Sequence, residues 1–253
     1  MLAVIAARGG SKGLPRKNLR MLGGRPLVSW PVAAAKAARA VDRVLISSDD
    51  PEIIRAAQAA GAEAPFVRPP ALATDTASST DVVRHALDAV HAAGEQYGYI
   101  ILLEPTSPLT EAIDVDNALG CLHEAREYAD AIVGVTRTES AHPEYAVRRS
   151  ELGIIQPYSA PNFRSLRRRQ DVERLYSLDG SLYASGTSAF LQRGSFYHER
   201  TLGLEMPRWK SLEVDSLLDF ICIEAVLANR DELRDAEIAG STNVTGRSSP
   251  RSG

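Results

Sequence analysis

Three features of this 253-residue sequence predict an α/β fold with a mostly parallel sheet flanked by helices. Short apolar runs alternate with Ala-rich amphipathic segments along the first half of the chain. This alternation is typical of parallel strands joined by helical crossovers. With 44% hydrophobic and 24% charged residues, the chain is long enough for one substantial core or a core with a small subdomain.

The apolar runs and the amphipathic segments set the expected order of elements. Strands are expected at 2–7, 43–50, 99–105 and 130–136. Helices are expected at 27–40, 51–62, 81–93 and 114–127. Pro31 is compatible with the first helix because it falls in the first turn, whose N–H groups have no partner in the helix.

The pattern changes between residues 140 and 178. Prolines and arginines become frequent there and the helical period is lost, which predicts an inserted β-rich arm. The expected core therefore comprises 1–139 and 179–239. Residues 240–253 are polar and rich in Gly and Ser, so a disordered tail is predicted.

Composition narrows the possible functions. No segment approaches the roughly 20 apolar residues of a membrane span and no signal peptide is evident, so a cytoplasmic protein with no membrane partner is expected. Cys121 and Cys222 stand alone and the five His residues lack metal-ligand spacing, which disfavours disulfides and zinc. The net charge of −3 disfavours a nucleic-acid partner. Eight cations nevertheless precede the first acidic residue, Asp42.

The stretch ARGGSKGLPRKN, residues 7–18, leaves the carboxyl end of the first expected strand, where open α/β sheets bind ligands. Its glycines allow backbone N–H groups to turn inward, and its cations can surround a triphosphate: Gly9, Gly10 and Gly13 with Arg8, Lys12, Arg16 and Lys17. The stretch is neither a Walker loop nor GxGxxG. The alternative interpretation is a solvated basic turn.

A second signal is the pair Glu213 and Asp215 in EVD. On a strand end both side chains would face the same way, about 6.6 Å apart, and would repel by roughly 2.5 kcal/mol. Mg²⁺ offsets such repulsion and prefers one or two carboxylates plus substrate oxygens. The alternative is a solvated strand end at which salt screens the charges.

Several motifs in one order resemble the CMP-sialic acid synthetases, or acylneuraminate cytidylyltransferases, which activate nine-carbon acidic sugars with CTP. They are ARGGSKGLPRKN, SSDDPEI, RPPALATDTASST, PTSPL, RRQ, DGSLY and SLEVDSLLDF, and they span about 210 residues. The resemblance implies a nucleotidyltransferase (Rossmann-like) core, Mg²⁺ as cofactor, and CTP as co-substrate. Kdo synthetases share the fold and reaction, but their first loop usually lacks the GGSKG core.

The resemblance also implies residue roles. The triphosphate would be held by Arg8, Gly9, Gly10, Ser11, Lys12, Lys17 and Asn18, and the cytosine by Arg68 and Ser79. The sugar site would comprise Glu104, Arg169, Gln170, Tyr183, Phe196 and Tyr197. The catalytic residues would be Lys12, Lys17 and Asp215, with Glu213 and Asp215 at the metal. From the residues alone, Ser79 is equally well explained as a helix N-cap, and the aromatics as core.

In the implied reaction the anomeric hydroxyl of the sugar attacks the α-phosphorus of CTP and pyrophosphate leaves. This sequence departs from the family pattern at four positions near the implied sugar site: Glu104, Thr110, Asp179 and Tyr145. Each change alters the polarity around the acceptor, so a legionaminic acid is expected to fit about as well as a sialic acid. At the first position of the carboxylate pair, where the family usually has Asp, this sequence has Glu213. A Kdo-type or other sugar cytidylyltransferase and a non-catalytic nucleotide-binding relative remain alternatives. The resemblance further implies a homodimer in which Arg169, in a dimerisation arm, serves the partner's sugar site.

Overall fold

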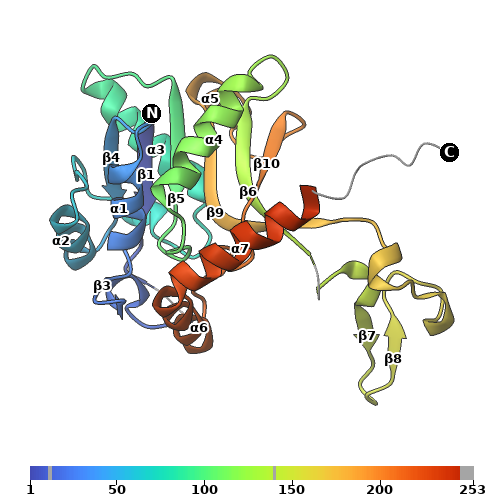
Figure 1. The fold of residues 1–253 in the computed structure, drawn as a ribbon. Coiled ribbons are helices and arrows are strands. Elements are labelled where there is room, and N and C mark those ends of the chain that lie inside the picture. Colours follow the sequence, from blue (N-terminus) through green and yellow to red (C-terminus); the bar gives the residue numbers. More distant parts are fainter. Residues whose placement is uncertain (11–12, 139–140, 246–253) are drawn as a thin grey trace.

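The computed structural model describes residues 1–10, 13–138 and 141–245 (Figure 1). Its main sheet has six strands in the order β10-β6-β9-β5-β1-β4. Their bounds are β1 (Leu2–Ala6), β4 (Arg43–Ser47), β5 (Tyr99–Leu103), β6 (Ala131–Arg137), β9 (Tyr176–Gly186) and β10 (Thr201–Glu205). β1 runs parallel to β4 and β5, and β10 runs parallel to β6. β9 is antiparallel to both β5 and β6. The predicted mostly parallel sheet is confirmed.

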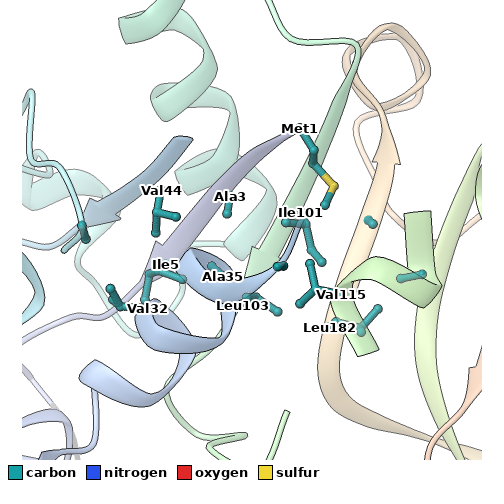
Figure 2. Packing of buried hydrophobic residues seen from close by; sticks show 14 of the residues in the cluster. Met1, Ala3, Ile5, Val32, Ala35, Val44, Ile101, Leu103, Val115 and Leu182 are labelled. Atoms are coloured by element: carbon teal, nitrogen blue, oxygen red, sulfur yellow. The ribbon is translucent and has the colours of Figure 1, made fainter. Parts of the chain in front are cut away.

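The core fills both faces of this sheet, which explains why the strands are apolar at nearly every position. Alternate residues of β1 point to opposite sides. Ala3 and Ile5 pack with Val32 and Ala35 of α1 on one face, as Figure 2 shows. Leu2 and Val4 face the other side, where α3 and α5 cover the sheet; the residues contributed there include Val83, Ala86 and Phe190.

The helices that flank the sheet begin with recognisable caps. α1 (Ser29–Ala37), α2 (Pro51–Ala59) and α4 (Ala112–Glu124) cover one face, and α3 (Ser79–Ala92) and α5 (Thr187–Arg193) the other. Asp50 caps α2 and Ser78 caps α3 through side-chain bonds to backbone N–H groups. Pro31 lies in the first turn of α1, as predicted. A short hairpin, β2 (Met21–Leu22) and β3 (Arg25–Pro26), follows the turn η1 (Lys17–Leu19), and the turn η2 is Pro70–Leu72.

Between β6 and β9 the chain leaves the sheet and forms a projecting arm (Figure 1). Within the described residues the arm holds only one small hairpin, β7 (Val147–Arg149) with β8 (Ile155–Pro157), so the expectation of a β-rich arm was too strong. The rest is the turns η3 (Pro143–Tyr145), η4 (Phe163–Ser165) and η5 (Arg169–Asp171). Prolines explain this, because each removes a ladder donor. Residues 176–178 already belong to β9 and pair with β6.

The described chain ends in two helices, α6 (Leu217–Ala228) and α7 (Arg230–Thr245). Residues 240–245, predicted to be disordered, continue α7, whereas 246–253 lie outside the described residues. Asp231 and Glu232 in the first turn of α7 favour the helix through its dipole. Arg234 of α7 forms an ion pair with Glu111, with 2.6 Å between the guanidinium nitrogen and the carboxylate oxygen. Among the described residues, no helix is both long and apolar enough to cross a membrane.

Candidate active site

A cleft of about 420 Å³ opens at the carboxyl ends of β1, β4 and β5. This is the edge at which open parallel sheets bind ligands. Loops from four distant parts of the chain line it with Ala6, Arg8, Gly13, Lys17, Asn18, Arg68, Leu72, Thr74, Asp75, Ala77, Ser79, Val82, Glu104, Pro105, Thr106 and Asp215. The fold therefore gathers most of the residues predicted to bind the nucleotide.

The glycine-rich loop after β1 is held by polar contacts of its own. The backbone N–H of Gly9 donates to Asp49 at 2.9 Å, and the Asn18 amide donates to the Arg8 carbonyl at 2.9 Å. Asn18 is buried, so the structure gives it a supporting role in addition to the predicted triphosphate contact. Arg8 pairs with Asp75 at 2.7 Å. Ser11 and Lys12 lie outside the described residues, so their predicted roles stay predictions.

Lys17 and Gly13 join this loop to the segment that carries the predicted metal ligands. The Lys17 ammonium donates to the Val214 carbonyl at 2.6 Å and lies 3.4 Å from Asp215, with 14% of its side chain exposed. A Cβ on Gly13 would lie 2.5 Å from the Asp215 carbonyl oxygen, so this close approach requires glycine. The contact places a cation beside a carboxylate at the cleft mouth. At Gly10, by contrast, an added Cβ would meet open space, so packing does not require glycine there.

The two residues predicted to contact cytosine both lie in the cleft. Arg68 is buried and donates to the Ser47 carbonyl at 2.6 Å. Burial lowers its pKa to about 10, so it stays charged at neutral pH. The Ser79 hydroxyl donates to Glu104 at 2.9 Å. Ser78, not Ser79, is the N-cap of α3, so the N-cap interpretation of Ser79 is wrong.

Glu213 and Asp215 lie on an extended loop, so the prediction that they stand on a strand end is wrong. This loop, residues 207–216, is not hydrogen-bonded along a neighbouring strand; instead the Val214 N–H donates to the Thr106 carbonyl at 2.8 Å. Glu213 is exposed as a residue, yet its carboxyl group packs over Gly180, where a Cβ would lie 1.5 Å from it. Gly180 lies in β9, where its pairing with β6 shifts register, and has a φ of +68°, so both its backbone conformation and the Glu213 contact favour glycine.

Negative charge accumulates at this end of the cleft. Partial burial of the carboxyl group and the charges of Asp215 and Glu104 raise the pKa of Glu213 to about 7. Burial also raises the pKa of Glu104, with Asp215 adding to it and Ser79 and Lys17 opposing. Among the described residues no group of three His, Cys, Asp or Glu could hold a metal unaided. Mutually repelling carboxylates suit a hard divalent cation that takes its other ligands from substrate and water.

Lys210 and Asp179 fix the loop that carries these carboxylates. The Lys210 ammonium is buried against Asp114 at 2.8 Å and Glu111 at 2.7 Å, at the start of α4. The Ser211 hydroxyl donates to Asp179 at 2.9 Å, and Ser181 donates to the same carboxylate at 2.6 Å. Asp179 is therefore a buried anchor instead of the sugar-facing group expected. A single lysine near an acidic motif carries no sequence signal, so this support was missed.

Among the predicted sugar-site aromatics, Phe196 lies in the core, whereas Tyr183 and Tyr197 are only partly buried and lie near Glu104. Phe196 is buried and packs on Phe190 at 4.7 Å between ring centroids, which supports the core interpretation for this residue. The ring centroids of Tyr183 and Tyr197 lie 6.0 Å apart in an edge-on arrangement. Burial and the nearby Glu104 raise the pKa of Tyr183, so its hydroxyl stays neutral. These two tyrosines offer a polar, uncharged wall next to the acidic group.

Arg169 and Gln170 lie in η5 of the arm, apart from the cleft of their own chain. Figure 1 shows the arm extending away from the sheet. Arg169 lines a separate cavity of about 200 Å³ whose walls include Arg137, Thr138, His142, Tyr145, Val172, Glu173 and Arg174. Within one chain, the structure does not bring these two residues to the other predicted site residues.

Comparison with known proteins agrees with this geometry. A family model described as cytidylyltransferase matches residues 2–216. Pseudaminic acid cytidylyltransferase of Campylobacter jejuni is 31% identical over 86% of this chain and 92% of its own length. CMP-N,N'-diacetyllegionaminic acid synthase of Legionella pneumophila is 29% identical over 92% of this chain and 98% of that protein. N-acylneuraminate cytidylyltransferase of Escherichia coli is 30% identical over 87% of this chain but only 50% of that longer protein.

Solved structures support the same fold. A CMP-2-keto-3-deoxy-manno-octonic acid synthetase in complex with CTP superposes with a TM-score of 0.64 and 20% identity, over 90% of this chain and 98% of that one. A cytidylyltransferase from Leptospira borgpetersenii gives a TM-score of 0.57 at 12% identity, over 99% and 98% of the two chains. The family model that spans most of the sequence, with relatives at this identity and a cleft that gathers the signature residues, shows that the chain is a nucleotidyltransferase of the cytidylyltransferase family.

Proposed function

We propose that this enzyme transfers CMP from CTP to the anomeric hydroxyl of an acidic nonulosonate sugar of the sialic or legionaminic type, releasing pyrophosphate. The observation that carries the proposal is the contact of Lys17 with the 213–215 segment, because it places a cation beside Asp215 at one end of a nucleotide-sized cleft, with Glu213 close enough for its charge to interact with both. The relatives named above act on pseudaminic, legionaminic and neuraminic acids, which supports the acceptor class.

The cleft residues divide the work of holding CTP. Arg8 and Lys17 would bind the phosphates, together with Ser11 and Lys12 of the same loop, while Arg68 and Ser79 would fix the cytosine edge. Asp215 and Glu213 would hold Mg²⁺, which when bound neutralises charge on the phosphate oxygens. Lys17 would stabilise the charge that develops as pyrophosphate leaves, and the rigid cleft would align the attacking hydroxyl.

The acceptor would lie beyond the α-phosphate, along Tyr183, Tyr197 and Glu104. The two neutral tyrosine hydroxyls can hydrogen-bond sugar hydroxyls or an acyl group, and neither repels an acidic sugar. Glu104 has its pKa raised, and a protonated Glu104 would donate a hydrogen bond to the acceptor. This environment favours an acceptor that is rich in hydrogen-bonding substituents over a purely anionic one.

The active unit would be a homodimer in the cytoplasm, where CTP is made. Arg169 and Gln170 lie too far out on the arm to serve the cleft of their own chain, and an arginine that enters the partner's cleft would pair with the acceptor's carboxylate.

The test is a panel of acidic sugars assayed with CTP and Mg²⁺ for pyrophosphate release. Neuraminic, legionaminic and pseudaminic acids and Kdo form the acceptor arms, and ATP and GTP form the donor controls. Turnover with CTP and at least one nonulosonate is expected. Preference for Kdo would move the enzyme to the eight-carbon branch, and equal turnover with a purine nucleotide would remove CTP specificity.

A further inference from the structure

A second cavity, of about 170 Å³, lies where the β2–β3 hairpin meets α1 and the junction of α6 and α7. None of the residues that line it lines the nucleotide cleft. Two arginines stand at its rim, Arg25 of β3 and Arg230 of α7. Its floor is apolar and consists of Ala33, Ala34, Ala37, Pro108, Leu109 and Leu227. We call this cavity the Arg25 pocket.

Arg25 is held in the pocket by an aromatic ring. Its guanidinium carbon lies 3.6 Å from the centroid of the Trp30 ring, so the two planar groups are in contact. The Trp30 indole N–H donates to the Leu22 carbonyl at 3.1 Å, which fixes the ring. Within residues 1–10, 13–138 and 141–245, no carboxylate pairs with Arg25 and no side-chain hydrogen bond engages its guanidinium. Its five N–H donors are therefore available to a ligand.

Arg230 is only weakly paired. Its guanidinium lies 3.8 Å from a carboxylate oxygen of Glu111 and 3.8 Å from one of Asp231, both beyond hydrogen-bonding distance. The Glu111 carboxylate is also shared by two closer cations, Lys210 at 2.7 Å and Arg234 at 2.6 Å. One carboxylate thus serves three cations on this side of the pocket, so positive charge is left over.

The two rim arginines also repel each other. Burial and the charge of Arg230 lower the pKa of Arg25, although a guanidinium stays protonated at neutral pH. An anion between the two groups would relieve this repulsion. A carboxylate suits the position because its two oxygens match the planar fork of a guanidinium.

The size and floor of the Arg25 pocket restrict the rest of the ligand. Its 170 Å³ is less than half the 420 Å³ of the nucleotide cleft, and it lies below the roughly 300–1,000 Å³ of sites for drug-sized molecules. A nucleotide is therefore too large. The apolar floor favours a ligand with a flat hydrocarbon body, so the matching class is a small organic acid.

Three walls of the pocket continue into the nucleotide cleft. The Val28 N–H, just after the hairpin, donates to the carbonyl of the cleft residue Asn18 at 2.9 Å. Residues 108–112 follow Thr106 of the cleft, and α6 begins two residues after Asp215. One apolar cluster packs these segments together, with the hairpin and α6 at the same end of the molecule (Figure 1). A change in the pocket therefore has a short physical route to the cleft.

We propose that the Arg25 pocket is a second ligand site, which binds a small, flat organic acid and transmits its occupancy to the nucleotide cleft. The bound acid would neutralise the repulsion between Arg25 and Arg230 and hold the hairpin against the α6–α7 junction. The segments that carry Lys17 and Asp215 would then be held together, so CTP should bind more tightly when the pocket is filled. The inference does not depend on which sugar accepts CMP.

The first test uses Trp30 as a reporter. The sequence has two tryptophans, so Trp209→Phe leaves Trp30 as the single fluorophore of its kind. This protein is titrated at constant ionic strength with benzoate, its neutral analogue benzamide, and inorganic phosphate. We expect a saturable change with benzoate and at least about 10-fold weaker binding of benzamide, because a charge-assisted hydrogen bond is lost. Phosphate, which has no apolar body, should also bind more weakly than benzoate. Equal binding of benzamide would overturn the anion site, and tighter binding of phosphate would overturn the organic acid.

The second test removes each rim arginine separately. Arg25→Gln and Arg230→Gln should each weaken benzoate binding at least about 10-fold. Arg39→Gln is the matched control, since this side chain is 88% exposed and lies outside the pocket. Arg8→Gln, in the nucleotide cleft, should also leave benzoate binding unchanged, which shows that the signal does not come from CTP's own site. Arg230 is partly exposed, so its variant tests the site even if Arg25→Gln fails to fold. Unchanged benzoate affinity in a folded Arg230→Gln protein would overturn the proposal.

The third test measures the coupling. In calorimetry, saturating benzoate should lower the Kd of CTP about 5-fold or more, and CTP should lower the Kd of benzoate by the same factor. Benzoate should leave the Kd of CTP unchanged in Arg25→Gln. Unchanged or weaker CTP binding to the benzoate-filled wild type would overturn the coupling. The site and the proposed function fail separately, because the absence of turnover with every acidic sugar would refute the function and leave the benzoate titrations as they are.

Discussion

Replacing Glu213 by Gln should make the protein more stable at alkaline pH, even though it removes a proposed metal ligand. In the folded protein the Glu213 pKa is raised to about 7 from its ordinary value of 4.5, because its carboxyl group is partly buried beside Asp215 and Glu104. The folded state therefore holds this proton more tightly than the unfolded state. Stability is unaffected by this group at low pH and falls as pH rises through 4.5 towards 7.

The size of the effect follows from that difference. A shift from 4.5 to about 7 corresponds to at most about 3.4 kcal/mol of destabilisation at pH 8. Because Glu213 is exposed at the cleft rim, solvent screening reduces this to roughly 1 kcal/mol. For a chain of this size, 1 kcal/mol raises Tm by about 2–4 °C. At pH 5 only about a quarter of the effect should remain.

The assay is thermal unfolding without divalent cations at pH 5 and pH 8, for wild type, Glu213→Gln and the control Glu224→Gln, an exposed acid in the middle of α6. We expect Glu213→Gln to unfold at a higher temperature at pH 8, with a smaller gain at pH 5, and the control to match wild type at both. An equal gain at both pH values would show that the effect is not electrostatic. A loss of stability at pH 8 would refute the reasoning.

Four further outcomes are expected. Lys17→Ala should fold normally but lower turnover by about 100-fold, as loss of one preorganised charge stabiliser does; unchanged kcat would exclude Lys17 from the chemistry. Gly13→Ala should lower CTP affinity in calorimetry, because its Cβ would displace the Asp215 backbone; wild-type affinity would show that the loop adapts freely. Lys210→Met should reduce the free energy of unfolding, measured in urea, by about 3 kcal/mol, because two buried carboxylates lose their cation. The same variant should need a higher Mg²⁺ concentration for half-maximal activity. An unchanged Mg²⁺ dependence would mean that Lys210 does not position the 213–215 segment. Mixing Arg169→Ala with Lys17→Ala should restore part of the activity through hybrid dimers, and no recovery after demonstrated subunit exchange would show that the arm does not act in trans.

Local pattern determined much of this molecule. Apolar runs such as LAVIA and YIILL are too short for typical helices and so predict buried strands, and Ala-rich amphipathic segments predict the helices that cover them, so the α/β class followed from the sequence. The glycines and cations after the first strand predicted a phosphate-binding loop, because phosphate binding needs local backbone freedom and local charge. Strand direction is not a local property, so the antiparallel β9 was not predicted.

Only the tertiary structure decided what these side chains do. Lys17 meets the Val214 carbonyl across 197 residues of sequence, and no spacing rule predicts that contact. Two adjacent serines look alike in sequence, yet backbone geometry makes Ser78 the helix cap and frees Ser79 to bind Glu104. Asp179 became a buried anchor because Ser211 and Ser181 enclose it. Burial and electric fields belong to the folded arrangement, so the charge state of Glu213 is decided by the fold and not by the sequence around it.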